Sequence, residues 1–172
     1  ISGRFNRSEA VQVDLNPSQM DAMSSAMSRR LTIIQGPPGT GKTHTAVATL
    51  AQLAREGRGP ILATAESNVA VDNLLEGLLG LGVRAVRIGR PVKVRETLRM
   101  ATLDAQLEEH PKQDEIASVR DEMDEVHRAL PKLKGREKGL AHRDIQHNKK
   151  ELRRLEREMI ASVLDGAEVI CS

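Results

Sequence analysis

Apolar and polar positions form short alternating blocks over the first half of the chain, and the blocks predict strands and helices in turn. Aliphatic and β-branched runs at 31–34, 61–65 and 83–88 are typical of buried strands. Residues 44–56 and 69–79 instead space their apolar positions by three and four, as one face of a helix does. Strands that alternate with helices predict an α/β fold with a parallel sheet and flanking helices.

The periodicity of the second half is different, because 96–164 reads mostly as helix. Two apolar stripes with heptad-like spacing run through it. The first consists of Ile116, Val119, Met123, Val126 and Leu130, and the second of Leu140, Leu152, Leu155, Met159 and Val163. Pro131 and Gly135 mark a turn between them, so we expect an antiparallel helical hairpin. Residues 167–171 then read as a strand that returns to the sheet, which makes the hairpin an insertion.

Charge density supports the same division of the chain. Residues 1–90 contain 17 charged side chains, whereas the slightly shorter remainder contains 33. We therefore expect an α/β core at 1–90, a charged helical hairpin at 91–164, and a core strand at 165–172. The net charge of +2 is too small to indicate nucleic-acid binding by itself.

Composition limits the chemistry that is available. Phe5 is the only aromatic residue, so base stacking within this chain would have to use arginine. Cys171 is the only cysteine and cannot form an internal disulfide, which suits an intracellular protein, cytoplasmic or nuclear. No apolar run approaches the length of a membrane span. The missing initial Met and the abrupt end lead us to expect a piece of a longer chain.

Residues 36–43 match the pattern G-x-x-x-x-G-K-[ST] between an expected strand and an expected helix. In such a loop, glycines let successive N–H groups converge on phosphate oxygens at the positive end of the helix. Lys42 would contact the β- and γ-phosphates of ATP, and the Thr43 hydroxyl would ligate Mg²⁺. A glycine-rich turn that binds nothing is the alternative, but it leaves the Lys-Thr pair and the strand–helix context as coincidences. The expected nucleotide site comprises Gly36, Pro37, Pro38, Gly39, Thr40, Gly41, Lys42, Thr43 and His44.

Three segments together resemble superfamily 1 helicases. Residues 15–19 look like their Q motif, 35–43 like their P-loop, and 65–74 like their motif Ia. The last is the most discriminating, because P-loops of this form also occur in AAA+ proteins. The most similar branch holds the nonsense-mediated-decay (up-frameshift) helicase and the immunoglobulin-mu-binding helicase. Residues 86–91 and 168–172 also resemble that branch, whereas Glu66 stands where the family often has proline.

The resemblance implies a RecA-like P-loop NTPase domain and a role for further residues. Gln19 would hydrogen-bond the adenine edge, although a polar surface position early in a helix is the alternative. Ser67 and Asn68 would bind the phosphates of single-stranded RNA or DNA. Both residue types are also good helix N-caps, and the two roles are compatible. The family further implies an ATP-dependent, monomeric motor that moves 5′ to 3′.

The basic residues outside these motifs have two interpretations each. Arg84, Arg87 and Arg90 are candidates for a basic rim, but solubility of the surface explains them equally well. The stretch at 149–154 offers contacts to phosphates, but ion pairs along a solvated helix are the favoured interpretation.

Hydrolysis requires parts that this sequence does not offer. No apolar strand ends in the Asp-Glu pair that holds Mg²⁺ and orients the attacking water, and Asp165 follows a helix. We therefore expect an N-terminal portion of the first helicase motor domain, which binds ATP-Mg²⁺ without hydrolysing it. The alternatives are a non-helicase AAA+-like ATPase, or a module that binds its partner through the hairpin and keeps a vestigial nucleotide site.

Overall fold

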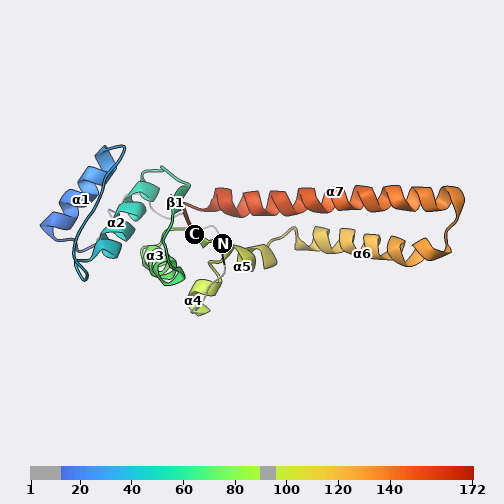
Figure 1. Cartoon of the computed structure of the whole chain (residues 1–172), viewed down its shortest axis with the longest axis horizontal. Coiled ribbons are helices and arrows are strands. Elements are labelled where there is room, and N and C mark those ends of the chain that lie inside the picture. The colour runs from blue at the N-terminus through green and yellow to red at the C-terminus, as the bar shows by residue number, and fades with distance from the viewer. Residues whose placement is uncertain (1–12, 90–95) are drawn as a thin grey trace. The chain divides into compact units, whose positions relative to one another are not determined.

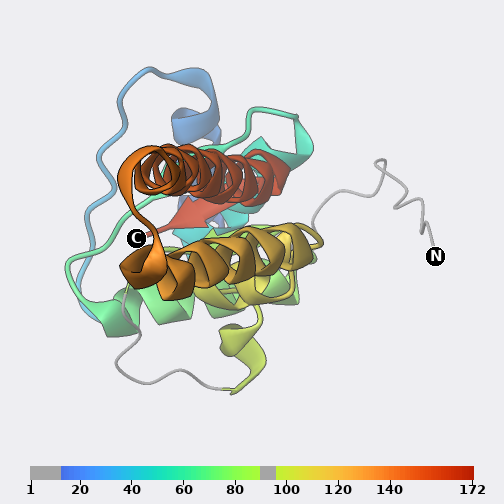
Figure 2. The same cartoon turned by 90° about the vertical axis from the view of Figure 1, so that its right-hand side faces the viewer.

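A computed structural model of the chain describes residues 13–89 and 96–172 (Figures 1 and 2). The chain divides into two compact units. One runs to Thr102 and includes Leu164–Ser172, and the other is Leu103–Val163. Arg90 of the expected basic rim lies outside the described residues.

The first unit is built on a parallel sheet of three strands. These are β1 (Ile61–Ala63), β2 (Ala85–Arg87) and β3 (Val169–Cys171), in the order β1-β3-β2. Val169 lies opposite both Ile61 and Ala85, so the strand from the end of the sequence occupies the centre. The predicted α/β class with a parallel sheet and flanking helices is confirmed, and it is consistent with a P-loop NTPase domain.

Side chains cap the starts of α1 (Pro17–Ser28) and α3 (Asn68–Gly80) in this unit, whereas α2 (Lys42–Arg55) begins after Gly41 without a side-chain cap. The helix α1 has a capping box, in which the Asn16 side chain and the Gln19 side chain each accept from the other's backbone N–H. The unit also contains the short α4 (Glu96–Arg99). Helices α2 and α3 pack closely at Gly77, where an added Cβ would lie 2.9 Å from a methyl carbon of Val47.

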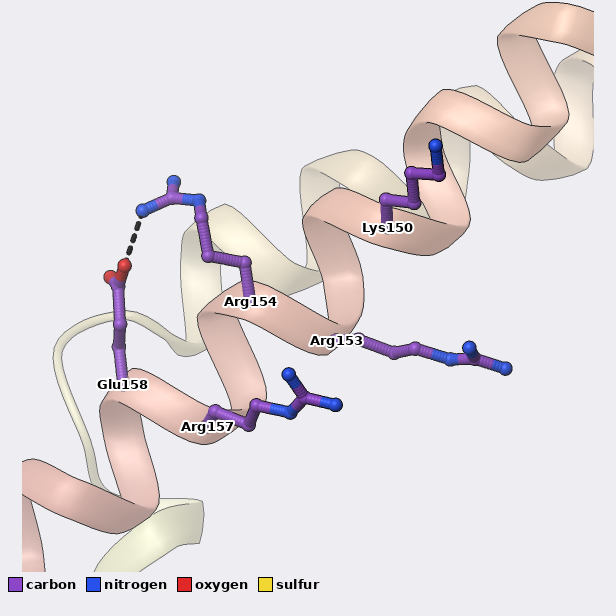
Figure 3. Close-up of a pocket in the computed structure, with 5 residues that line it drawn as sticks. All are labelled: Lys150, Arg153, Arg154, Arg157 and Glu158. Atoms are coloured by element: carbon purple, nitrogen blue, oxygen red, sulfur yellow. Dashed lines mark hydrogen bonds and ion pairs between the residues drawn. The ribbon is translucent and has the colours of Figure 1, made fainter.

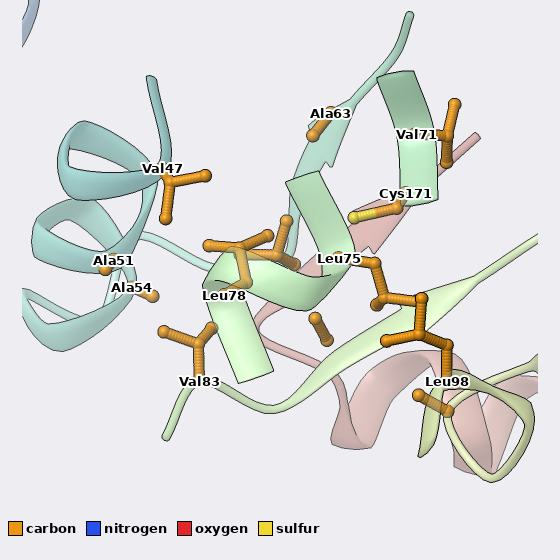
Figure 4. Packing of buried hydrophobic residues seen from close by; sticks show 13 residues of the cluster. Val47, Ala51, Ala54, Ala63, Val71, Leu75, Leu78, Val83, Leu98 and Cys171 are labelled. Atoms are coloured by element: carbon orange, nitrogen blue, oxygen red, sulfur yellow. The ribbon is translucent and has the colours of Figure 1, made fainter. Parts of the chain in front are cut away.

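The core of the first unit forms where α2 and α3 cover the sheet. Leu75, Leu78, Val169 and Cys171 have no exposed surface, and Figure 4 shows Leu78 facing the small residues of α2. Burial raises the pKa of the Cys171 thiol to about 11. This cysteine therefore acts as a neutral apolar side chain of the core at ordinary pH.

The prediction of a strand at 31–34 is wrong, because the described sheet does not include this segment. This segment has no regular structure, and Leu31 and Ile33 are 79% and 84% exposed. A parallel strand needs hydrogen bonds from a neighbour, and no backbone bond joins 31–34 to another strand of the described residues. Its apolar composition is that of a strand, but composition alone does not supply a partner.

The second unit is a helical hairpin. It contains α5 (Leu103–Glu108), α6 (Gln113–Ala129), the 3-10 turn η1 (Leu130–Lys132) and most of α7 (Gly135–Gly166). Helices α6 and α7 lie side by side and run in opposite directions (Figures 1 and 2).

The hairpin is joined by an apolar cluster and by ion pairs. Ile116, Leu155 and Met159 are buried together, and Arg120 pairs with Glu156 at 3.4 Å. The predicted apolar stripes are therefore mostly confirmed. The prediction that Leu140 belongs to the buried stripe is wrong, since this residue is 47% exposed. Ala141 and Ile145 are the buried residues of that part of α7. Among the described helices, none is both long and apolar enough to cross a membrane.

Candidate nucleotide and nucleic-acid site

The loop before α2 has the backbone geometry that only glycine adopts easily. Gly39 and Gly41 have φ values of +81° and +80°. A Cβ at Gly41 would lie 2.5 Å from the Gln19 amide nitrogen, and one at Gly36 would lie 2.8 Å from the Thr40 hydroxyl. Glycine is thus favoured by backbone conformation at 39 and 41, and at 36 an added Cβ would displace the Thr40 hydroxyl.

The polar groups of the loop fit an anionic ligand. Within the described residues, the backbone N–H groups of 41–44 donate to no acceptor. They precede or form the first turn of α2, where the helix dipole favours negative charge. The Lys42 ammonium group donates to the carbonyl oxygens of Gly36 and Pro37, at 2.7 and 2.9 Å. Unpaired donors and one ammonium group in a glycine cradle match the oxygens of a polyphosphate.

The two residues after Lys42 differ in their surroundings. The Thr43 side chain is exposed, and its hydroxyl has no partner among the described residues. Such a hydroxyl is free to ligate a cation held by a nucleotide. The Nε2 atom of His44 lies 3.2 Å from the Asp14 carbonyl oxygen, so its side chain ties α2 to the segment before α1.

Gln19 connects α1 to the loop. Its Oε1 accepts from the Asn16 N–H at 3.0 Å, and its Nε2 donates to the Thr40 carbonyl oxygen at 3.1 Å. A carboxamide has two acceptor sites and two hydrogens. One acceptor site and one hydrogen therefore remain, which is the pair that an adenine edge requires. The capping role and the proposed adenine contact are compatible.

At the carboxyl end of β1, Ser67 and Asn68 divide their tasks. The Ser67 hydroxyl accepts from the Ala70 N–H at 3.3 Å and caps α3. The Asn68 Oδ1 atom accepts from Arg87 at 3.0 Å. That bond fixes the orientation of the Asn68 carboxamide, so its NH₂ group is the part left for a ligand. Phosphate oxygens accept hydrogen bonds and would suit it.

The prediction that Arg87 belongs to a basic rim on the surface is wrong, because its side chain is only 1% exposed. Its Nε donates to Asp72 Oδ1 at 2.7 Å, and its Nη1 donates to the Gly89 carbonyl oxygen at 2.9 Å. A buried guanidinium needs acceptors, and these two bonds together with the bond to Asn68 give each of its three nitrogen atoms an acceptor. Arg84 does lie on the surface, where it pairs with Glu168 at 3.5 Å.

One signal for this network is present in the sequence, and the motif-based predictions missed it. Asp72 stands among apolar residues of α3, four positions after Asn68 and on the same helical face. A carboxylate on a face that packs against a sheet requires a cation there, and Arg87 is the cation at the end of the next strand.

A comparison with families of known proteins matches residues 14–172 to the AAA_11 model, described as an AAA domain. The chain belongs to this family. The match covers the capping box, the glycine loop, the sheet and the hairpin.

Relatives of this AAA_11 chain agree with the resemblance found in its motifs. DNA-binding protein SMUBP-2 of Mesocricetus auratus is 38% identical over 91% of the chain. DNA polymerase alpha-associated DNA helicase A of Schizosaccharomyces pombe is 31% identical over 91%, and a regulator of nonsense transcripts 1 homolog of Arabidopsis thaliana is 35% identical over 92%. The predicted relation to this branch of superfamily 1 helicases is confirmed. The chain spans 16%, 24% and 12% of these three relatives, respectively.

Proposed function

We propose that this chain is the ATP-binding portion of a helicase motor that moves 5′ to 3′ on single-stranded RNA or DNA. The observation that carries the proposal is the glycine loop at 36–43, which combines unpaired N–H groups, the Lys42 ammonium group and a hydrogen bond from Gln19. Several relatives are named as helicases or as DNA-binding proteins, and this favours a helicase over a non-helicase AAA+-like ATPase.

In this proposal the loop holds ATP through its phosphates. Lys42 binds the phosphate oxygens as a point charge, and Thr43 ligates the Mg²⁺ ion that neutralises the same oxygens. Residues 1–90 would form the ATP-binding core, 91–164 the inserted hairpin, and 165–172 the returning strand. Without an Asp-Glu pair after a strand, the chain by itself would bind ATP-Mg²⁺ and not hydrolyse it. Its place would be inside the cell, in the cytoplasm or nucleus, as a monomer.

Gln19 supplies the base specificity in this proposal, and Gln19→Glu tests it. Glutamate keeps the oxygen that caps α1 but loses the NH₂ group, so a donor for the base is lost while the capping acceptor remains. We expect the affinity for ATP to fall about 10-fold and the affinity for GTP to change much less. Fluorescence titration with labelled ATP and GTP measures both.

Gln146→Glu, in the hairpin unit, makes the same change of charge and serves as the control. An unchanged ratio of ATP to GTP affinity in Gln19→Glu would mean that Gln19 only caps the helix.

Asn68 is the proposed contact to nucleic acid, because its Oδ1 atom is occupied by Arg87 and its NH₂ group is left for a ligand. Asn68→Ala removes that donor. We expect the affinity for a labelled single-stranded oligonucleotide to fall about 10-fold, measured by fluorescence anisotropy, with the affinity for ATP unchanged.

Asn73→Ala is the matched control, since Asn73 is an exposed asparagine of the same helix. Equal losses in the two variants, or no loss in Asn68→Ala, would contradict the proposed contact.

A further inference from the structure

The outward face of α7 carries a row of cations. Arg143, Lys150, Arg153 and Arg157 recur at intervals that keep them within about 80° of one another on a helix with about 100° per residue. All four are exposed. The buried residues of α7 lie on the opposite side of the helix, at Ala141, Ile145, Leu155 and Met159. The row therefore faces away from the packing that holds the hairpin together.

These four cations have no carboxylate partner among the described residues. The glutamates of the same helix turns are already engaged. Arg154 pairs with Glu151 and Glu158, and Lys112 of the same hairpin also pairs with Glu158. The hydrogen bond from Lys112 lowers the pKa of the Glu158 carboxyl group. The ion-pair interpretation of 149–154 thus holds for Arg154 and Glu151 but not for Lys150 and Arg153.

Figure 3 shows how the side chains divide. Arg154 turns toward Glu158, whereas Arg153 and Arg157 both extend away from Glu158, and Lys150 lies farther along the helix with its side chain pointing in another direction. These residues line a shallow pocket. Unpaired cations that share one side of a helix produce a local positive potential. This potential does not appear in the small net charge, which sums over the whole chain.

We propose that this row binds the sugar–phosphate backbone of a nucleic-acid strand. From Lys150 to Arg157 the helix rises about 10 Å. That length covers several phosphates, given about 3.4 Å of axial rise per nucleotide in a DNA strand. The row has no apolar centre and no aromatic residue, whereas the core of a protein interface is apolar. The contact is independent of sequence, because it reaches phosphates and not base edges.

The inference rests on the proposed helicase function for the presence of a nucleic acid, and it adds a second contact to that of Asn68. The hairpin is then more than an insertion that the fold tolerates. It supplies electrostatic affinity, which the loop at 67–68 cannot supply with neutral side chains.

The test is the triple variant Lys150→Gln, Arg153→Gln and Arg157→Gln in the 172-residue chain. The matched control is Lys132→Gln, Lys134→Gln and Lys138→Gln, which removes the same charge from exposed positions at the turn of the hairpin. Anisotropy of a labelled single-stranded oligonucleotide is measured over a range of salt concentrations. The plot of log affinity against log salt has a negative slope, and each lost contact to a single strand should make that slope shallower by about 0.7. The loss of three contacts should therefore make it shallower by about 2.

At about 0.1 M salt we expect the triple variant to lose about 10- to 100-fold in affinity and the control to lose much less. Circular dichroism checks that both variants keep their helices, and binding of labelled ATP should be unchanged in both. Equal losses in the two variants would overturn the proposal, since only total charge would then matter. Displacement of the oligonucleotide by polyglutamate at equal charge would also overturn it, in favour of an acidic protein. Loss of binding in Asn68→Ala alone would leave the helicase proposal standing and reject this one.

Discussion

Replacing Asp72 by alanine is expected to lower the free energy of unfolding by about 3 kcal/mol. Asp72 is the carboxylate partner of Arg87, whose side chain is 1% exposed. Removal of one member of a buried ion pair costs about 3–5 kcal/mol, because the other charge stays buried without compensation. We place the effect at the lower end because Asn68 and Gly89 still accept from Arg87. Urea unfolding followed by circular dichroism measures it, since the chain has no Trp or Tyr for fluorescence.

Two further variants separate charge from hydrogen bonding. Asp72→Asn keeps an acceptor for Arg87 and should lose less stability than Asp72→Ala. Arg84→Ala breaks an ion pair with a side chain that is 69% exposed, and it should cost less than about 1 kcal/mol. If Asp72→Ala proved no more destabilising than Arg84→Ala, the buried pair would not be what holds α3 to the end of β2.

The parts of the fold that depend on local chemistry were predictable from the sequence. Asn16-Pro17 indicates a helix start, and the structure places a capping box there. The glycine pattern at 36–43 indicates a backbone with positive φ, and Gly39 and Gly41 have it. In these cases the cause lies within a few residues, so that a short pattern contains the whole reason for the structure.

The errors concern properties that depend on distant partners. Residues 31–34 have the composition of a strand, but a strand forms only beside another one, and the described sheet leaves them without it. Arg87 looks like a surface cation in the sequence, and only its position opposite Asp72 and Asn68 makes burial favourable. The same limit applies to α7, where pairing of Arg154 but not of Arg153 follows from side-chain directions and not from spacing alone.

Replacing Lys42 by alanine is expected to weaken ATP binding about 10- to 100-fold. In the structure the Lys42 ammonium group lies within the glycine loop, held by the Gly36 and Pro37 carbonyl oxygens. Phosphate oxygens are stronger acceptors than these carbonyls because they are charged, and a hydrogen bond to a charged group contributes about 1.5–3 kcal/mol. A fluorescent ATP analogue titrated in the presence of Mg²⁺ measures the change. Lys138→Ala, on the hairpin, removes the same charge and should leave the affinity nearly unaltered.

Turnover distinguishes binding from catalysis in the same samples. Lys42 and Thr43 position phosphates and Mg²⁺, but attack by water also needs an acidic pair to orient it, and the sequence has none after a strand. We therefore expect no phosphate release above background, with or without a single-stranded oligonucleotide, even where ATP binds. Appreciable release that Lys42→Ala abolishes would show that residues of this chain supply the missing acid. The first carboxylate to replace would then be that of Asp14, because the backbone of this residue contacts His44 directly after the loop.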